Sequence, residues 1–175
     1  MTGLPDLAGR PVLQVGRGEF IATYGHLFEH SPWVVERAWL SHPFKDAAGL
    51  HRAFLDVLEQ ADPDERLALV RAHPELADKA AVAAGLTEAS SAEQASAGLD
   101  RLTEAEYADF HALNRAYRTR FGFPFIICVR LHDKAGILAE MGRRLQRAPE
   151  TELTEALAQV GSIVRLRLAD VKLAG

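Results

Sequence analysis

Along most of this chain, apolar residues recur every three to four positions, which is the spacing of a helix that buries one face. The repeat begins near Gly18 and continues almost to the C-terminus. It is most regular in one segment, whose apolar side carries Tyr107, Phe110, Leu113, Tyr117 and Phe121. The hydrophobic pattern therefore predicts a chain made mainly of amphipathic helices.

Capping residues mark several of the expected helix ends. Asp46 precedes one periodic segment, and the sequence Asp-Pro-Asp-Glu at 62–65 is a full start signal for the next. Thr-Glu-Ala-Glu at 103–106 gives the same kind of signal before the most regular segment, and Gly122 is a natural stop after it. Local start and stop signals thus agree with the helical period.

One stretch departs from that period. Residues 123–131, FPFIICVRL, resemble a strand, but a single strand cannot form a sheet, so we expect a buried extended connector. Residues 1–17, with two prolines and three glycines, are expected to be a loosely structured lead-in. The sequence predicts an all-α fold: a single domain over residues 1–175, built as a bundle of about seven to nine helices.

Composition and charge narrow the range of partners. Of the 175 residues, 48% are hydrophobic and 25% charged, and the net charge of −4 comes from scattered charges. No basic stripe is available for nucleic-acid phosphates or anionic lipid, so we expect neither nucleic acid nor a membrane as a partner. Cys128, the only cysteine, lies in an apolar run and is expected in the core. The N-terminus lacks a secretory pattern, and we expect a cytoplasmic location.

A histidine stands at the end of one expected helix. Pro74 disfavours helical geometry at His73, so the helix should end there, where its dipole favours an imidazolium and raises the pKa of His73 toward neutrality. Such a histidine can exchange a proton near pH 7, although a histidine that only terminates a helix fits the same pattern. An Ala-rich helix over 75–84, closed by Gly85, is expected next.

A cluster of polar residues follows at 90–94. Ser90 and Glu93 have the spacing of a capping box, and a functional pair fits that spacing equally well. Gln94 is not required by a capping box. A carboxylate beside a carboxamide can exchange hydrogen bonds with a ligand that carries urea or amide groups.

Arg167 interrupts the apolar stripe of the last expected helix, which runs from about Glu150 to about Leu173. The stripe consists of Leu153, Leu157, Val160, Val164 and Val171. An arginine that faces a core is costly unless it meets an anion. Two anions fit this position: an internal carboxylate, or a substrate carboxylate held in a bidentate fork.

His26 and His30 are one helical turn apart, a spacing that metal ligands can have. They lack the glutamate of an H-E-x-x-H motif and an evident third ligand, so we expect no metal site. A metal-dependent hydrolase that uses these two histidines is an alternative that the sequence alone leaves open.

Five blocks of the sequence, taken in order, resemble one family. They are FEHSPWVVERA (28–38), RAHPELADKAA (71–81), LTEASSAEQASAGLDRL (86–102), FHALNRAYRTRFGFPFIICVR (110–130) and RLRLADV (165–171). Together they are similar to the 2-oxo-4-hydroxy-4-carboxy-5-ureidoimidazoline (OHCU) decarboxylases of urate degradation. The resemblance covers most of the chain. Asp78 departs from it, because glycine is the commoner residue in the family.

The resemblance implies an all-helical, cofactor-free carboxy-lyase that converts OHCU to (S)-allantoin and carbon dioxide. It implies two catalytic residues, His73 and Glu93. The substrate-binding residues that it implies are Pro74, Ser90, Gln94, Phe121, Phe123, Phe125, Ile126 and Arg167. The partners are then two small molecules, OHCU and (S)-allantoin, and a homodimer is one compatible assembly.

Two other functions fit parts of the pattern. A related lyase acting on another ureide or purine-derived ring would keep the same blocks. A non-catalytic helical ligand-binding module would explain the helices and their caps. That module gives no reason for Arg167 on an apolar stripe together with the pairs His73-Pro74 and Glu93-Gln94, so we favour the decarboxylase.

Overall fold

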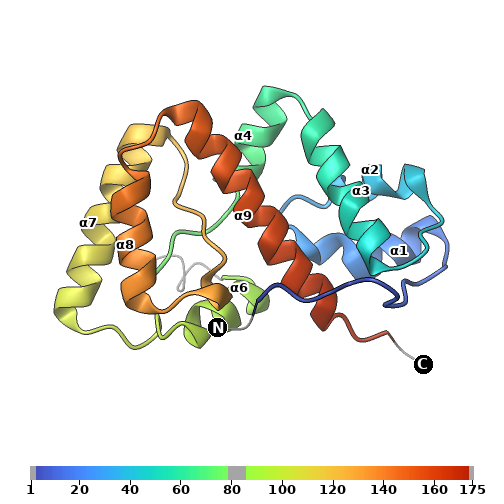
Figure 1. The fold of residues 1–175 in the computed structure, drawn as a ribbon, viewed down its shortest axis with the longest axis horizontal. Coiled ribbons are helices and arrows are strands. Elements are labelled where there is room, and N and C mark those ends of the chain that lie inside the picture. Colours follow the sequence, from blue (N-terminus) through green and yellow to red (C-terminus); the bar gives the residue numbers. More distant parts are fainter. Residues whose placement is uncertain (1–2, 79–85, 174–175) are drawn as a thin grey trace. The chain divides into compact units, whose positions relative to one another are not determined.

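Helices make up most of the structure, a computed structural model that describes residues 3–78 and 86–173. The chain divides into two units: a central unit, residues 73–159, and a terminal unit, residues 3–72 with 160–173. The described residues form eight α-helices, three 3-10 helices and no β-strand (Figure 1). The all-α fold class and the expected number of helices are confirmed, and the single-domain organisation stays a prediction.

The terminal unit consists of four helices, the end of a fifth and two 3-10 helices. They are α1 (Arg17–Tyr24), η1 (Gly25–Leu27), α2 (Trp33–Ala38), η2 (Trp39–Ser41), α3 (Ala47–Gln60), α4 (Pro63–Arg71) and the last turns of α9 (Pro149–Asp170). Asp46 accepts a hydrogen bond from the N–H of Gly49 at 2.9 Å. Asp62 and Glu65 form a reciprocal capping box. Both of these predicted start signals are confirmed.

Residues 3–16 precede α1 and form no helix. Leu7 and Val12 are nevertheless buried, and Arg10 Nη1 donates a hydrogen bond to the carbonyl of Ala169 at 3.0 Å. The described part of the expected lead-in therefore lacks regular secondary structure but makes apolar and polar contacts within its own unit.

The central unit contains α6 (Glu88–Ser96), α7 (Glu104–Phe121), η3 (Val129–Leu131), α8 (Lys134–Arg144) and the beginning of α9. Thr103 and Glu106 form the predicted capping box of α7, and Gly122 ends that helix with a φ of 75°. Only glycine adopts this left-handed conformation without strain. Residues 123–128 are buried and belong to no helix or strand, which confirms the connector over these residues. The expected end at residue 131 is wrong, because Val129–Leu131 form the 3-10 helix η3.

Three expected helix boundaries differ from the structure. The last helix, α9, ends at Asp170, three residues before the expected end near Leu173. α6 begins at Glu88, and the hydroxyl of Thr87 accepts a hydrogen bond from the N–H of Ser90 at 3.3 Å. Ser90 therefore lies inside the helix, and the capping-box alternative for Ser90 and Glu93 is wrong. In the expected helix over 75–84, residues 75–78 form a turn, and the rest, with Gly85, lies outside the described residues.

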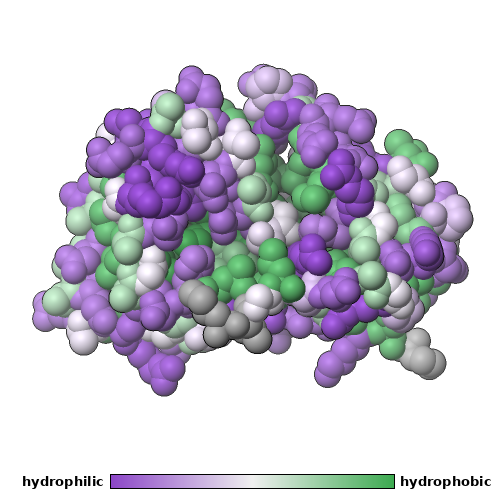
Figure 2. All heavy atoms as spheres, viewed as in Figure 1, coloured by the Kyte–Doolittle hydropathy of each residue, from purple (hydrophilic) through white to green (hydrophobic). Residues whose placement is uncertain are grey.

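The surface agrees with the scattered charges of the sequence. Figure 2 shows hydrophilic side chains over much of the visible face, interrupted by smaller apolar areas. Within residues 3–78 and 86–173, no helix is both long enough and apolar enough to cross a membrane.

The substitution Gly142→Ala is expected to raise the free energy of unfolding by about 0.5–1 kcal/mol, because alanine restricts the unfolded chain and favours a helix. Gly142 lies in α8, and no described neighbour comes within 4 Å of the position that a Cβ would take. Gly136 in the same helix is the matched control, because a Cβ there would lie 3.1 Å from Oδ1 of the capping residue Asp133. Chemical denaturation should rank Gly142→Ala as the more stable variant; the reverse order would contradict this prediction.

Candidate functional site

His73 lies directly after α4, in the non-helical segment 73–78. The N–H of Ala72 bonds to the carbonyl of Ala68, and α4 ends at Arg71, within two residues of the predicted position. His73 and Pro74 are both half-buried. His73 is therefore neither fully buried nor fully exposed, and its backbone belongs to a segment with several fixed contacts.

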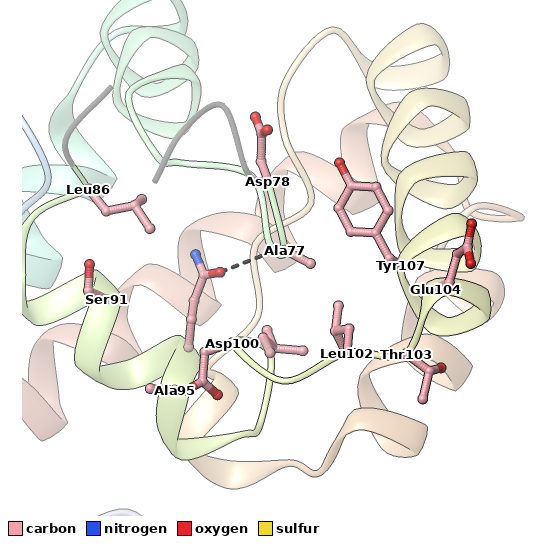
Figure 3. Close-up of a pocket in the computed structure, with 12 residues that line it drawn as sticks. Ala77, Asp78, Leu86, Ser91, Ala95, Asp100, Leu102, Thr103, Glu104 and Tyr107 are labelled. Atoms are coloured by element: carbon pink, nitrogen blue, oxygen red, sulfur yellow. Dashed lines mark hydrogen bonds between the residues drawn. The ribbon is translucent and has the colours of Figure 1, made fainter. Parts of the chain in front are cut away.

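Three side chains fix the segment 73–78 within the central unit. Gln94 accepts a hydrogen bond from the N–H of Ala77 at 3.0 Å, drawn dashed in Figure 3, and donates one to the carbonyl of Glu75 at 3.3 Å. Asn114 Nδ2 donates to the carbonyl of Leu76 at 2.8 Å. Arg118 Nε lies 2.6 Å from the carboxylate of Glu75. Each hydrogen-bonded group comes from α6 or α7, so these two helices determine the course of the segment after His73.

The predicted cluster Ser90, Glu93 and Gln94 lies on α6. Ser90 and Gln94 are one helical turn apart and both are buried, whereas Glu93 is half-buried. Because Ser90 lies inside the helix, Glu93 does not serve as the reciprocal residue of a cap at its start. Gln94 has a structural role that the sequence did not predict, since its amide bridges α6 and the segment that follows His73.

The predicted binding residues between 121 and 126 lie at the end of α7 and in the connector. Phe121 is half-buried, and Phe123, Phe125 and Ile126 are buried. The ring of Tyr117 in α7 lies 4.6 Å from that of Phe121 and 5.3 Å from that of Phe125. Aromatic packing on one helix therefore supports this part of the connector.

A buried ionic cluster lies beside the connector, and the pattern of the sequence did not predict it. Arg144 in α8 and Glu152 in α9 are both fully buried, and Arg144 Nε donates to Glu152 Oε1 at 2.6 Å. The Tyr117 hydroxyl also donates to Glu152 Oε1. Burial, and next the hydrogen bond to Glu152, raise the pKa of Tyr117 far above its usual value, so the hydroxyl remains a donor.

The same signal that identified Arg167 could have identified Arg144. Ile137, Met141 and Arg144 are the buried residues of α8, and their spacing is that of one apolar stripe. A cation on such a stripe calls for an anion. The hydrophobic spacing within α8 could not identify that anion as Glu152, because Glu152 belongs to another helix, α9.

Arg167 lies in the terminal unit, whereas the other predicted site residues lie in the central unit. Arg167 is buried, its Nη2 is 3.0 Å from Glu29 Oε1, and its Nη1 donates to the carbonyl of Leu27 at 3.2 Å. Of the two anions that the sequence allowed, the internal carboxylate is present in the structure. A role in substrate binding stays a prediction.

A cavity of about 790 Å³ lies between α6, the segment 73–78 and the start of α7 (Figure 3). Among the described residues that line it, Gln94 is the only predicted site residue. Asp78, Asp100 and Glu104 also line it.

The two histidines considered as metal ligands lie in the terminal unit, His26 in η1 and His30 shortly after it. The part of the chain that the structure describes contains no group of three or more His, Cys, Asp or Glu side chains placed to hold a metal ion. Cys128 is buried, as expected for a core residue.

Replacing Asn114 with leucine is expected to lower the free energy of unfolding by about 1–3 kcal/mol, because it leaves the carbonyl of Leu76 without its donor. Arg118→Met is the matched control: Arg118 contacts the same segment through an ion pair in which the arginine is exposed, and pairs that solvent reaches contribute about 0–1 kcal/mol. Urea denaturation measures both variants. An Asn114→Leu protein no less stable than Arg118→Met would show that the hydrogen bond to Leu76 is not important.

Comparison with known proteins gives consistent matches. A family model described as OHCU decarboxylase matches residues 14–169. A protein of Haloferax volcanii named 2-oxo-4-hydroxy-4-carboxy-5-ureidoimidazoline decarboxylase is 41% identical over 165 residues, which is 94% of this chain and 96% of that protein. The protein of the same name from Bos taurus is 38% identical over 154 residues, 88% of this chain and 91% of that one.

Solved structures show the same similarity. The crystal structure of an (S)-allantoin synthase matches with a TM-score of 0.70 and 31% identity over 89% of this chain, which spans 50% of that longer chain. A crystal structure of OHCU decarboxylase in the presence of (S)-allantoin matches with a TM-score of 0.67 over 88% of this chain and 96% of that chain. At 22% identity, this second match concerns the fold.

Proposed function

Because this chain belongs to the OHCU decarboxylase family, we propose that it catalyses the decarboxylation of OHCU to allantoin in urate degradation. The observation that carries the proposal is the family match, which includes the segments that hold His73, Glu93 and residues 121–126. The relatives that bear the decarboxylase name match over nearly their whole length, so the proposal concerns the full reaction.

The substrate can supply its own electron sink. Loss of carbon dioxide breaks the bond from the carboxylate to the carbon that bears the hydroxyl. That electron pair forms a double bond to the neighbouring ring carbon, and the C=N pair moves onto the ring nitrogen, which takes a proton. The hydroxyl then gives up its proton and becomes a carbonyl, while the neighbouring ring carbon takes a proton. One hydroxyl proton and one solvent proton balance the two that are added.

The protein must then orient the substrate, exclude water and deliver one proton to one face of the ring. In our proposal His73 accepts the hydroxyl proton and Glu93 delivers a proton to the ring carbon, which makes the product (S)-allantoin. Pro74 and Ser90 contact the substrate beside these two groups. Gln94 and backbone groups of residues 121–126 bind the ureido and ring amides. Arg167 holds an anionic or polar part of the substrate. None of these steps uses a cofactor or a metal.

The activity is tested by making OHCU in place from urate with urate oxidase and hydroxyisourate hydrolase, adding this protein, and following circular dichroism. The uncatalysed reaction gives racemic allantoin and hence no lasting signal. We expect a rapid signal of (S)-allantoin. A signal no different from the blank would refute the proposed activity.

The role of Glu93 has its own test. Glu93→Gln keeps the size and removes the proton that a carboxylic acid delivers, so we expect a fall in kcat of about 10²–10⁴-fold and a less stereospecific product. Glu88→Gln, on the first turn of the same helix, is the control. If Glu93→Gln changed neither the rate nor the stereochemistry, another group would deliver the proton.

A homodimer and a cytoplasmic location stay predictions from the sequence. Light scattering coupled to size-exclusion chromatography would give the mass of the assembly in solution, and cell fractionation would give the location.

A further inference from the structure

The backbone of the connector between α7 and η3 needs hydrogen-bond partners. Regular secondary structure does not supply them. Residues 123–128 are buried and lie in neither helix nor strand. Buried backbone N–H and C=O groups are costly without hydrogen bonds. The carbonyl of Ile126 accepts from Arg144 Nη1 at 2.8 Å, and the N–H of Cys128 donates to Gln159 Oε1 at 2.9 Å. Side chains of α8 and α9 thus take the place of a neighbouring strand.

Arg144 contacts the connector in two ways. Besides the hydrogen bond to Ile126, its guanidinium carbon lies 4.4 Å from the centre of the Phe125 ring. A cation at this distance over an aromatic face is attracted to it. Arg144 therefore fixes both the main chain of Ile126 and the side-chain plane of Phe125, two consecutive residues with a proposed role in substrate binding.

Glu152 and Tyr117 hold Arg144 in this orientation. Glu152 accepts from Arg144 Nε and from the Tyr117 hydroxyl through the same oxygen, and the ring of Tyr117 packs on Phe125. A planar guanidinium bound through Nε to a carboxylate and through Nη1 to a carbonyl has little freedom left to rotate. The position of the connector is then determined by a chain of contacts that begins on α9.

Stability alone gives no reason for such a cluster. Replacing a buried ion pair with apolar residues of similar volume is often neutral or stabilising by about 1–4 kcal/mol. A carboxylate and a guanidinium that are both fully buried are therefore better explained by the geometry that they impose.

We propose that Arg144, held by Glu152 and Tyr117, is a positioning residue for the decarboxylation reaction. It holds the backbone groups of Phe125 and Ile126 in the positions where they can form hydrogen bonds with the ureido and ring amides of the substrate. This inference rests on the proposed function, and it adds three residues to the machinery of that site. Errors of about 1 Å in positioning can lower a rate by about 100-fold, so a fixed backbone at this place has a large effect.

The test replaces the whole pair in the double variant Arg144→Met/Glu152→Leu, which avoids leaving one buried charge unpaired. The matched control is Arg143→Met/Glu140→Leu, because Arg143 is the next residue of α8 and its pair with Glu140 is solvent-exposed. We expect the first double variant to melt at or above the wild-type temperature, yet to show a fall in kcat/KM of about 10–100-fold, mostly through KM. The control should match the wild type in both respects.

Amide hydrogen exchange supplies a second readout that does not depend on activity. Peptides covering residues 122–130 should exchange faster in Arg144→Met/Glu152→Leu and at the wild-type rate in the control. If the double variant does not fold, Tyr117→Phe replaces it, because that change removes only the hydroxyl bonded to Glu152 and keeps the aromatic packing.

The outcomes separate this inference from the proposed function. A wild-type protein without decarboxylase activity would refute the proposed function, and with it the catalytic part of the inference. An active wild type with unchanged KM, kcat and exchange in the folded cluster variant would refute the inference alone. Loss of kcat/KM with an undiminished melting temperature would support it, because a merely structural role predicts parallel losses.

Discussion

His73→Ala is expected to abolish enzymatic formation of (S)-allantoin while the protein stays folded. In the proposed mechanism His73 removes the hydroxyl proton, and loss of a general base lowers kcat by about 10²–10⁴-fold. The fold should tolerate the change, because the hydrogen bonds that fix this segment use the backbone of Glu75, Leu76 and Ala77. Circular dichroism of the product, with OHCU made in place, measures the rate.

The control for this experiment is His111→Ala. His111 is an exposed histidine on α7 in the same unit, and it has no proposed role in the reaction. A His73→Ala protein as active as His111→Ala would exclude proton transfer by His73. Glu93 would then be the candidate for accepting the hydroxyl proton.

Arg167→Met is expected to lower the free energy of unfolding by about 3–5 kcal/mol, because it removes the guanidinium that bonds to the buried carboxylate of Glu29. Adding Glu29→Leu should recover most of that loss, since the buried charge is then gone. Urea denaturation of the single and double variants gives the two free energies.

A surface pair provides the control for Arg167. Arg52 and Asp56 form an exposed pair on α3 at 2.8 Å, and Arg52→Met should cost less than about 1 kcal/mol. The pairing with Glu29 would be energetically unimportant if Arg167→Met cost no more than Arg52→Met. A restored double variant that still lacks decarboxylase activity would support a separate role of Arg167 in substrate binding.

The features that the sequence predicted well are those that depend on neighbouring residues. The caps at Asp46, Asp62 and Thr103 and the stop at Gly122 each involve groups within about one helical turn, and all four are present. Local chemistry was ambiguous at the start of α6, where two hydroxyl residues three positions apart compete as caps. The structure uses Thr87, which leaves Ser90 and Gln94 on a buried side.

The features that sequence could not predict depend on residues far apart in the chain. Tyr117 and Glu152 are 35 positions apart, and no period of hydrophobic residues relates them. The partner of Arg167 illustrates the same limit, since the stripe predicted an anion but not Glu29, which is 138 positions away. Gln94 was predicted as a ligand contact, and its two hydrogen bonds to the segment after His73 could be found only from coordinates.

The connector also has a consequence for the synthesis of the chain. Residues 125–129, FIICV, which include most of the connector, are aromatic, β-branched or otherwise apolar, carry no charge and contain no proline, a composition that favours cross-β aggregation when it is exposed. Its side-chain partners Arg144 and Gln159 come later in the chain, so a chain that ends before Arg144 contains this stretch without the groups that bond to its backbone. Nascent chains that end between residues 130 and 143 should therefore be insoluble and bound by chaperones, whereas chains that extend through α9 should not.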